Sequence, residues 1–514
     1  MNRKKGEKNI VTTIIKIVIS LIILGIQFLA FYLMLVGSLE FSRSFSFATR
    51  VLQAIVVIYM LYGHEKLAYK IPWLILIMFL PIAGIIIYFL WGKNRVSNKM
   101  KKARDKTIKN SHYLLEDDSN ILEKIKKSNV KKEINLLKAL TGYPVYENCG
   151  TEYLDIGEEY FKRLLEDIKN AQKYILIEFF IIAKGKLYNR IYDALKEKLK
   201  SGVKVIIIAD GWGSLLRYPK RLMDELEDMG AIVKKYNPLR FGINTYINYR
   251  DHRKIVVIDG CIAYTGGVNI ADEYTNEYVR FGHWKDTGIR FVGKACQSAT
   301  VAFLKNLEIA TNKVPDYEWF IKNRIKIYDT KSEGLIMFYT DGPDNRKNPG
   351  ENAYIELLNN AKEYVYIYTP YFVASSEMLT AMLNAKYSGV DVRIITPHKP
   401  DKWYVHLTTR SYYDVLLKAG VKVYEYLPGF LHAKSFVSDD DVSIVGSINL
   451  DYRSLNLSYE CATWTNGTGV ELKIKEDFIK TMNKSVEITL DDVKNRNIFI
   501  RILEALINTF APLM

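Results

Sequence analysis

Cysteine and histidine are both scarce in this chain of 514 residues, which holds four cysteines and seven histidines. The cysteines form no CxxC pair and show no ligand spacing with any histidine: Cys149, Cys261, Cys296 and Cys461. This pattern argues against a disulfide framework and against a zinc site, so we expect unpaired thiols and no metal. A secretory signal peptide is also not indicated, because the first apolar stretch is too long and further apolar segments follow it.

Long apolar runs fill the first hundred residues. Three segments stand out, namely Ile10 to Val36, Phe45 to Tyr62, and Pro72 to Trp91. The first and third are long enough to cross a hydrocarbon core of roughly 30 Å, whereas the middle one carries Arg50 and Gln53 and has interfacial or packing alternatives. Residues 1–92 are therefore predicted to be a membrane anchor with two or three transmembrane helices.

Basic residues flank the predicted anchor on both sides. Four precede it, and a denser run begins at Lys93 and continues to Lys109. The positive-inside rule places both ends in the cytoplasm, which requires an even number of crossings. Either the middle segment does not span, or one end breaks the rule. We expect a multi-pass protein of the cell membrane with its C-terminal bulk at the cytoplasmic face, joined through a basic linker or helical connection over residues 93–140.

The formal net charge of +15 indicates a partner that is anionic. A membrane surface or a phosphate-bearing substrate fits this charge, and nucleic acid fits it equally well on charge alone. The apolar N-terminus favours the membrane, so no nucleic-acid partner is expected.

The remainder of the chain repeats one pattern of helices and strands. In the first half a helix at Phe161 to Ala171 leads to a strand at Tyr174 to Ile182; in the second half the pair is Tyr354 to Ala361 and Tyr364 to Val373. Helices alternate with strands throughout, which predicts a mixed or largely parallel sheet flanked by helices, built twice. The predicted lobes are residues 141–330 and 331–494, related by an approximate twofold axis.

One motif occurs once in each predicted lobe, His-x-Lys-x4-Asp-x6-Gly-[Gly/Ser]-x-Asn. The first copy comprises His252, Lys254, Asp259, Gly266, Gly267 and Asn269. The second comprises His432, Lys434, Asp439, Gly446, Ser447 and Asn449, every position 180 residues later. Two of only seven histidines do not fall into such long matched patterns by chance. The motif histidines and lysines are thus candidates for one shared catalytic cleft.

These residue types suit phosphoryl transfer. A neutral imidazole can attack phosphorus, and a second imidazole can protonate the departing alkoxide and then deprotonate the incoming hydroxyl. Lysine and asparagine supply donors to the nonbridging phosphate oxygens, so no cofactor is needed. Asp259 and Asp439 have a second interpretation, in which they stabilise the turn after a strand instead of meeting the phosphate.

The doubled motif resembles that of the phospholipase D superfamily, and most of the chain from about residue 45 is similar to bacterial cardiolipin synthases within it. The segments that carry the resemblance, besides the motifs, are Pro72 to Gly92, Thr369 to Phe372, Val445 to Ser454 and the C-terminal tail. It implies an α/β fold of two phospholipase D-like lobes. It also implies a phosphohistidine intermediate, with His252 as nucleophile and His432 as acid and base.

The same resemblance implies further site residues. Asp286 and Glu460 match carboxylates that follow each motif, and each is expected to hold its histidine's far nitrogen and fix the tautomer. Asn269, Asn449, Ser447 and Gly267 are expected to support the phosphate. Because Gly267 stands where the second motif has Ser447, only one hydroxyl of this type is available to the phosphoryl group.

The implied reaction joins two phosphatidylglycerol molecules into cardiolipin and glycerol. Three alternatives stay open: a hydrolytic phospholipase D that releases phosphatidic acid, a nuclease of the same superfamily, and a non-catalytic scaffold that gathers anionic lipid. The oligomeric state is left unassigned. The tail, residues 495–514, is predicted to be an amphipathic helix that either packs on the body or docks on the membrane.

Glu178 lies on a predicted strand among apolar neighbours. A carboxylate there is costly unless it is paired, which makes Glu178 a further candidate for a role at the substrate.

Overall fold

A computed structural model describes residues 22, 25–29, 32, 39–63, 66–92, 98–115, 119–215, 217–238, 249–325, 332–345 and 347–513. Most of the predicted span from Ile10 to Val36 lies outside these residues. The chain divides into two compact units. One contains residues 1–97, 239–247 and 506–514, and the other contains residues 98–238 and 248–505.

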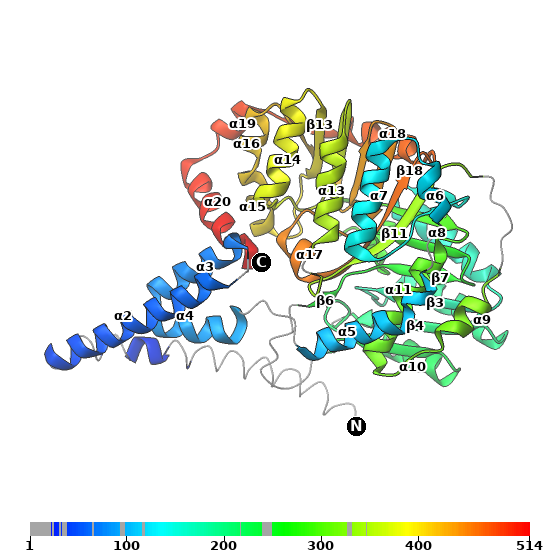
Figure 1. Cartoon of the computed structure of the whole chain (residues 1–514), viewed down its shortest axis with the longest axis horizontal. Coiled ribbons are helices and arrows are strands. Elements are labelled where there is room, and N and C mark those ends of the chain that lie inside the picture. The colour runs from blue at the N-terminus through cyan, green and yellow to red at the C-terminus, as the bar shows by residue number, and fades with distance from the viewer. Residues whose placement is uncertain are drawn as a thin grey trace. The chain divides into compact units, whose positions relative to one another are not determined.

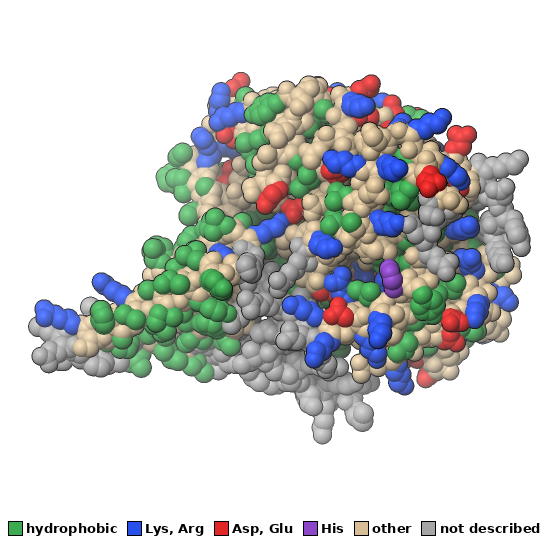
Figure 2. Space-filling model, viewed as in Figure 1, with side chains coloured by type: hydrophobic (Ala, Val, Ile, Leu, Met, Phe, Trp, Pro, Cys, Tyr) green, Lys and Arg blue, Asp and Glu red, His purple; other side chains and the backbone are tan. Residues whose placement is uncertain are grey.

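The first unit contains the apolar helices of the N-terminus. They are α2 (Leu39–Tyr62), α3 (Leu67–Phe79), α4 (Pro81–Ile87) and a π-helical turn, η1 (Tyr88–Gly92). Within α2, Arg43–Tyr62 is long and apolar enough to cross a membrane. Hydrophobic side chains cover this helix and its neighbours in Figure 2. Ile55 and Ile58 of α2 are 59% and 67% exposed. Such exposure of an apolar helix is typical of a surface that faces lipid.

The predicted span Pro72 to Trp91 is not one helix. Pro81 has no N–H to donate to the carbonyl of Ile77, and the helix breaks at Leu80. Two glutamines satisfy the backbone groups around this break. Gln53 Nε2 donates to the Ile77 carbonyl at 2.8 Å, and Gln27 Oε1 accepts from the N–H groups of Ile82 and Ala83, both at 3.1 Å. A broken helix inside a bilayer requires this compensation, because lipid offers no hydrogen bonds.

The described part of the stretch after the N-terminal apolar helices is helical. This matches the helical connection that the sequence offered as an alternative to a basic linker. Its elements are α5 (Asn98–Ser111), η2 (His112–Leu114), α6 (Ser119–Lys124) and α7 (Ser128–Thr141). Helix α7 packs on the second lobe, where the Glu133 carboxylate accepts from Asn360 at 2.8 Å and from the Trp464 indole at 2.8 Å. Helix α5 contacts α11, with Asn110 donating to Glu308 at 2.9 Å. These helices therefore belong to the body of the second unit.

The first lobe is a seven-stranded mixed sheet in the order β2-β10-β8-β7-β3-β4-β5, flanked by helices. Strands β3, β4 and β5 run parallel, and the others pair antiparallel. Helices α8 and α9 lie side by side against one face of the sheet (Figure 1). The elements are β1 (Tyr146–Glu147), β2 (Gly150–Leu154), α8 (Gly157–Asn170), β3 (Tyr174–Phe179), α9 (Lys186–Lys200), β4 (Lys204–Asp210), α10 (Lys220–Asp228), β5 (Ile232–Tyr236), β6 (Arg250–Asp251), β7 (Ile255–Ile258), β8 (Ile262–Gly266), η3 (Asp272–Thr275), β9 (His283–Lys285), β10 (Gly288–Val292), α11 (Cys296–Thr311) and α12 (Tyr317–Lys322).

The second lobe repeats this order as β11-β18-β17-β16-β12-β13-β14, to which β1 and β19 add at the two edges. Helices α13 and α14 lie side by side over its sheet (Figure 1). The elements are β11 (Leu335–Asp341), α13 (Pro349–Asn360), β12 (Tyr364–Tyr368), α14 (Ser376–Tyr387), β13 (Asp391–Pro397), α15 (Trp403–Ser411), α16 (Tyr413–Lys418), β14 (Lys422–Tyr426), β15 (Gly429–Leu431), β16 (Ser435–Ser438), β17 (Val442–Gly446), α17 (Tyr452–Asn456), β18 (Ser458–Asn466), α18 (Val470–Met482), β19 (Ser485–Ile488), α19 (Leu490–Lys494), α20 (Ile498–Phe510) and η4 (Ala511–Leu513).

The shared strand order confirms the prediction of a duplicated, mixed α/β architecture. Buried apolar residues explain why the sheets form: every residue of β3, β7, β12 and β17 is buried. A strand buried on both faces is mostly apolar in sequence, and these strands are so apart from Glu178 in β3 and Ser443 in β17. The cysteines are free and buried, as expected.

Candidate functional site

Each motif histidine follows a short strand that pairs with the other lobe. Strand β6 of the first lobe runs parallel to the start of β18, with Asp251 opposite Tyr459, and the His252 N–H donates to the Tyr459 carbonyl at 2.8 Å. This register brings His252 level with Glu460. The His252 Nδ1 lies 2.9 Å from both oxygens of that carboxylate.

The second motif repeats the arrangement with the two lobes exchanged. Strand β15 pairs parallel with β9 of the first lobe, with Leu431 opposite Lys285, and the His432 N–H donates to the Lys285 carbonyl at 2.7 Å. Asp286 directly follows β9, and its Oδ2 lies 2.5 Å from His432 Nδ1. Each carboxylate therefore holds the histidine of the opposite lobe.

This crossing corrects the sequence expectation that each carboxylate holds the histidine of its own motif. The reason is the strand pairing: β9, which precedes Asp286, pairs with β15 of the second lobe in a separate two-stranded sheet, and the start of β18, which precedes Glu460, pairs with β6 of the first lobe. A carboxylate that accepts from Nδ1–H leaves Nε2 with its lone pair, so both imidazoles are set in the same tautomer.

The site is buried and rich in charge. Burial, followed by the charges of Lys254 and Lys434, lowers the pKa of His252 well below its ordinary value. Burial and the same lysines, Lys434 first, lower the pKa of His432. The imidazoles are consequently neutral at neutral pH, as an attacking nitrogen must be. That each lysine acts on both histidines shows that the two motifs converge on one region.

The other charged groups of this region are shifted by burial as well. Burial lowers the pKa of Lys254 to about 8 and that of Lys434 to about 7. It raises the pKa of Asp286 to about 7 and that of Glu460 to about 8, while the lysines oppose the rise. Each lysine ammonium donates to the carbonyl of its own motif's histidine, which fixes the ammonium beside the imidazole.

Contrary to their assignment among the catalytic residues, Asp259 and Asp439 support the fold. Asp259 has a left-handed backbone, with φ of 52°, and its carboxylate accepts from three successive N–H groups at the start of β3: Gln172, Lys173 and Tyr174, at 2.7–2.9 Å. Asp439, with φ of 54°, accepts in the same way from Lys362, Glu363 and Tyr364 at the start of β12. The contacts match the turn interpretation, because these carboxylates satisfy backbone donors that nothing else reaches.

Two of the expected phosphate-supporting residues are also engaged within the protein. Asn269 Oδ1 accepts from the Ile181 N–H at 3.0 Å, and its Nδ2 donates to Tyr274 Oη at 2.7 Å. Ser447 Oγ donates to Glu460 at 2.5 Å, so its hydroxyl supports the carboxylate instead of the phosphoryl group. Asn449 differs from these, because its buried Oδ1 has no hydrogen-bond partner in the described part of the chain.

Gly267 is explained by the crossed carboxylate. A Cβ at this position would lie 2.1 Å from Asp286 Oδ1. The first motif thus has glycine where the second has Ser447 because Asp286 occupies the space that a side chain needs.

Aromatic rings around the histidines were not foreseen from the sequence. Phe180 lies edge-on to His252 at 5.1 Å between ring centroids. His432 is surrounded more fully, with Tyr274 and Trp284 at 5.6 Å and Phe430 at 5.8 Å. Only the position of Trp284, two residues before Asp286, offered a signal in the sequence. These rings exclude water from the imidazoles and contribute to the lowered pKa values.

Glu178 is paired within the protein. Its carboxylate lies 3.0 Å from Arg253 Nε, and Arg253 also reaches Asp251 at 2.9 Å. Burial raises the pKa of Glu178 well above its ordinary value, with Arg253 opposing. The residue thus belongs to a buried ionic cluster beside His252.

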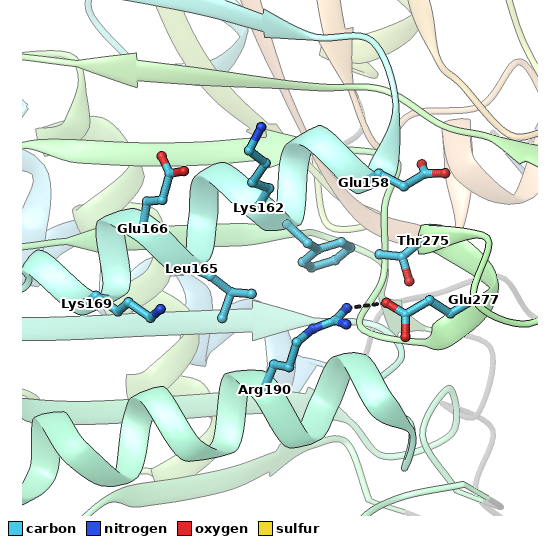
Figure 3. Close-up of a pocket in the computed structure, with 9 residues that line it drawn as sticks. Glu158, Lys162, Leu165, Glu166, Lys169, Arg190, Thr275 and Glu277 are labelled. Carbon is cyan, nitrogen blue, oxygen red and sulfur yellow. Dashed lines mark hydrogen bonds and ion pairs between the residues drawn. The ribbon is translucent and has the colours of Figure 1, made fainter.

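One described cavity lies apart from the histidines. It measures about 370 Å³ and opens between α8 and α9, where Lys162, Arg190 and Glu277 line it (Figure 3). Arg190 and Glu277 form an ion pair across its edge. None of the motif residues lines it.

Comparison with known proteins decides the family. A family model described as cardiolipin synthase, PLD-like domain, matches residues 164–278 and 354–483, and one described as phospholipase D-nuclease N-terminal matches residues 51–93. The cardiolipin synthase of Alkalihalophilus pseudofirmus is 31% identical over 95% of this chain and 99% of its own length. The chain belongs to the cardiolipin synthase family of the phospholipase D superfamily.

Further relatives agree with this. The major cardiolipin synthase ClsA of Bacillus subtilis is 32% identical over 92% of this chain and 98% of its own length. An uncharacterized protein of Streptococcus mutans is 37% identical over 89% of this chain and 99% of its own length. Membership of the cardiolipin synthase family makes the chain an enzyme of the phosphatidyltransferase class.

Among solved structures, the phosphatidylserine synthase of Haemophilus influenzae superposes with a TM-score of 0.56 at 16% identity, covering 75% of this chain and 98% of its own. At this identity the likeness supports the shared phospholipase D-like fold alone.

Proposed function

We propose that this chain is a cardiolipin synthase that transfers a phosphatidyl group from one phosphatidylglycerol to the terminal hydroxyl of another, releasing glycerol. The proposal rests on one observation above all: two imidazoles, each held at Nδ1 by a carboxylate of the opposite lobe, share one buried region with two lysines. The family relatives named cardiolipin synthase support the choice of lipid substrates.

In the first half of the proposed reaction, His252 Nε2 attacks the phosphorus of the donor lipid. A P–N bond forms, the bond from phosphorus to the glycerol oxygen breaks, and protonated His432 gives its proton to that oxygen. Glu460 stabilises the cation that develops on His252, as an orienting carboxylate does in other triads. Lys254 and Lys434 stabilise the nonbridging oxygens as charge builds on them.

In the second half, neutral His432 takes the proton of the acceptor hydroxyl, whose oxygen attacks the phosphohistidine. The P–N bond breaks and His252 is regenerated. Asp286 holds His432 in the orientation that serves both steps. The phosphodiester anion of the substrate also raises the pKa of the neighbouring imidazoles, which allows His432 to carry its proton in the complex.

Three features favour a multi-pass membrane enzyme with its lobes at the cytoplasmic face. The apolar helix Arg43–Tyr62 is long enough to span, the break at Pro81 has its backbone groups satisfied, and the dense basic run from Lys93 to Lys109 favours the cytoplasmic side for the lobes that follow it. Helix α20 adds to these. Its apolar residues are exposed, Phe499 by 77% and Ile502 by 51%, while its Glu504 is buried and paired with Arg496. An amphipathic helix with its apolar face outward is suited to lie in the bilayer interface.

Product analysis tests the reaction. Purified protein in phosphatidylglycerol vesicles should give equal amounts of cardiolipin and glycerol, and His252→Ala should abolish both. Phosphatidic acid without cardiolipin would establish hydrolysis, and cardiolipin levels indifferent to His252→Ala would establish a scaffold. Brief exposure of His432→Ala to phosphorus-labelled lipid should trap label on His252; label on another residue overturns the assigned roles.

Orientation is tested by thiol labelling, for which the four buried cysteines give a low background. A cysteine introduced at Tyr387, which is 70% exposed on α14, should react with a membrane-impermeant reagent in inverted vesicles and not in intact cells. The reverse result would place the lobes outside.

A further inference from the structure

Arg453 is a partly buried cation with one buried donor that has no partner. Its Nη1 is fully buried and has no hydrogen bond, and no ion pair of Arg453 occurs in the described residues. A guanidinium offers five donors and is never deprotonated in proteins, so burying one with donors unused is costly. Such a group is retained where a ligand supplies the missing acceptor.

The acidic groups nearest to Arg453 are committed elsewhere. Asp451 caps α17 and accepts from the Ser454 N–H at 2.8 Å. Asp210 accepts from Arg250 at 3.4 Å and from the Asp251 N–H at 3.0 Å. Burial lowers the pKa of Arg453, and Arg250 lowers it further while Asp451 opposes. Both carboxylates therefore already accept from donors other than Arg453.

Arg453 also lies beside the reacting groups. Helix α17 begins three residues after Asn449, the last residue of the second motif. Asp451, which acts on Arg453, acts on His252 as well, and Arg250 stands two residues before His252. The guanidinium therefore lies near the region that holds the two histidines.

We propose that Arg453 binds the phosphodiester of the second lipid, the phosphate that does not react. The inference rests on the proposed function and names the binding group for its second substrate. The second phosphatidylglycerol attacks the phosphohistidine with its terminal hydroxyl. Its own phosphodiester must therefore lie close to the reacting phosphate, separated from it by one glycerol. Lys254 and Lys434 face the histidines and serve the reacting phosphate. A planar guanidinium recognises the remaining phosphodiester through two parallel hydrogen bonds.

Water and free glycerol carry no phosphate, so a reaction that uses them as acceptors needs no site for a second phosphodiester. Such a reaction distinguishes binding of the second lipid from the catalytic steps. Exchange of labelled glycerol into phosphatidylglycerol needs only the first half of the reaction and its reversal. Cardiolipin formation needs the second lipid. We expect Arg453→Met to retain glycerol exchange within about twofold and to lower cardiolipin formation at limiting phosphatidylglycerol by about 10–100-fold, the range of a lost hydrogen bond to a charged group.

The experiment uses full-length protein in mixed micelles at fixed surface concentrations of phosphatidylglycerol. Arg453→Lys should restore part of the loss, and Arg221→Met serves as the control for charge, because that side chain on α10 is 85% exposed. A role in folding alone would lower the melting temperature and reduce both reactions together, which overturns the proposal. Equal rates of cardiolipin formation in Arg453→Met and wild type also overturn it.

Failure of the proposed function gives a different signature. If the wild-type protein forms no cardiolipin from phosphatidylglycerol, the transfer reaction itself is rejected. If it forms cardiolipin while Arg453→Met loses nothing, only the assignment of the second phosphate is rejected.

Discussion

The two motif loops carry the same chemical groups but are held in different ways. Around His252 the supports are ionic. Arg253 joins Glu178 and Asp251, Asn306 donates to Asp251 at 2.7 Å, and Arg250 reaches Asp210. Around His432 one buried ion pair, Lys285 with Asp477 at 2.6 Å, accompanies supports that are otherwise apolar and aromatic: Phe430, Leu431, Ala433, Tyr274 and Trp284.

Both half-sites use a carboxylate from the opposite lobe to hold the histidine. The other residues that support the histidine differ between the two half-sites. Glu460 reaches His252 and receives a hydrogen bond from Ser447, whereas Asp286, shorter by one methylene, reaches His432 across the space left by Gly267. An ionic shell fixes a position with directional contacts. An apolar shell fixes it by packing and excludes water.

The crossed carboxylates give the largest expected effects. Glu460→Gln and Asp286→Asn should each lower turnover of phosphatidylglycerol by on the order of 10²–10⁴-fold, because the imidazole loses its tautomer and the partner for its positive charge. A lipid whose leaving group is p-nitrophenol separates the two variants, because such a group departs without general acid help. Asp286→Asn should therefore retain the burst of p-nitrophenol release, and Glu460→Gln should lose it.

The variant pair His432→Ala and His252→Ala supplies the reference for this test. Asp286→Asn should behave like the former and Glu460→Gln like the latter. If Asp286→Asn instead loses the burst while Glu460→Gln keeps it, the carboxylates act within their own lobes and the crossing has no functional meaning.

The ionic support around His252 gives the next effect, on stability. Arg253→Met leaves Glu178 and Asp251 buried without their cation, which should lower the free energy of unfolding by about 3–5 kcal/mol. The double variant Arg253→Met with Glu178→Leu should recover part of this loss, because one of the two carboxylates that lost Arg253 is removed as well. Thermal unfolding in detergent measures both. Equal destabilisation in the single and double variants would show that the pair contributes through packing alone.

The lobes and the motif residues could be predicted from the sequence because each depends on local information. Apolar runs of strand length, the helical periods before them and the exact recurrence after 180 residues lie within short windows of the chain. The break at Leu80 also has a local cause, the missing N–H of Pro81, although its position within an apolar run made the whole segment resemble one span.

The pairing of each histidine with the opposite carboxylate has no local signal. It depends on β6 joining β18 and on β15 joining β9, contacts between residues more than a hundred positions apart. The contact of Asn269 has no local signal either, because its amide oxygen accepts from the N–H of Ile181, which is 88 residues away in the chain. Chemistry read from a motif gives the kind of residue, and tertiary pairing decides which partner each residue serves.

Exchanging the small residues of the two motifs should sharpen the comparison between the half-sites. Gly267→Ala introduces a Cβ 2.1 Å from Asp286 Oδ1, so the carboxylate must move away from His432. Ser447→Ala removes one hydrogen bond from Glu460, worth about 1.5–3 kcal/mol for a charged acceptor. We expect kcat to fall in both, about tenfold or more, with the p-nitrophenol burst retained only in Gly267→Ala. A neutral result for Gly267→Ala would mean that Asp286 relaxes without cost.

Lys402 should give the smallest effect and the one that depends on pH. Its exposed ammonium lies 5.3 Å from the Tyr371 ring and lowers the pKa of both histidines. The other charges that act on His252 are Lys254 and Lys434, which lower its pKa, and Asp451, which raises it. Lys402→Met removes one opposing charge, so the pKa of His252 rises, and the acid limb of kcat/KM, which requires the neutral imidazole, moves to higher pH.

The expected displacement is about 0.2–0.5 pH unit at low salt, because an exposed charge acts through water. It should disappear near 1 M salt, where the screening length is about 3 Å. Lys399→Met, a neighbouring exposed lysine, is the matched control and should leave the profile in place. A displacement toward lower pH, or one that persists at high salt, would mean that Lys402 acts by contact with the substrate. In that case the asymmetry between the half-sites would extend to the lipid that each of them receives.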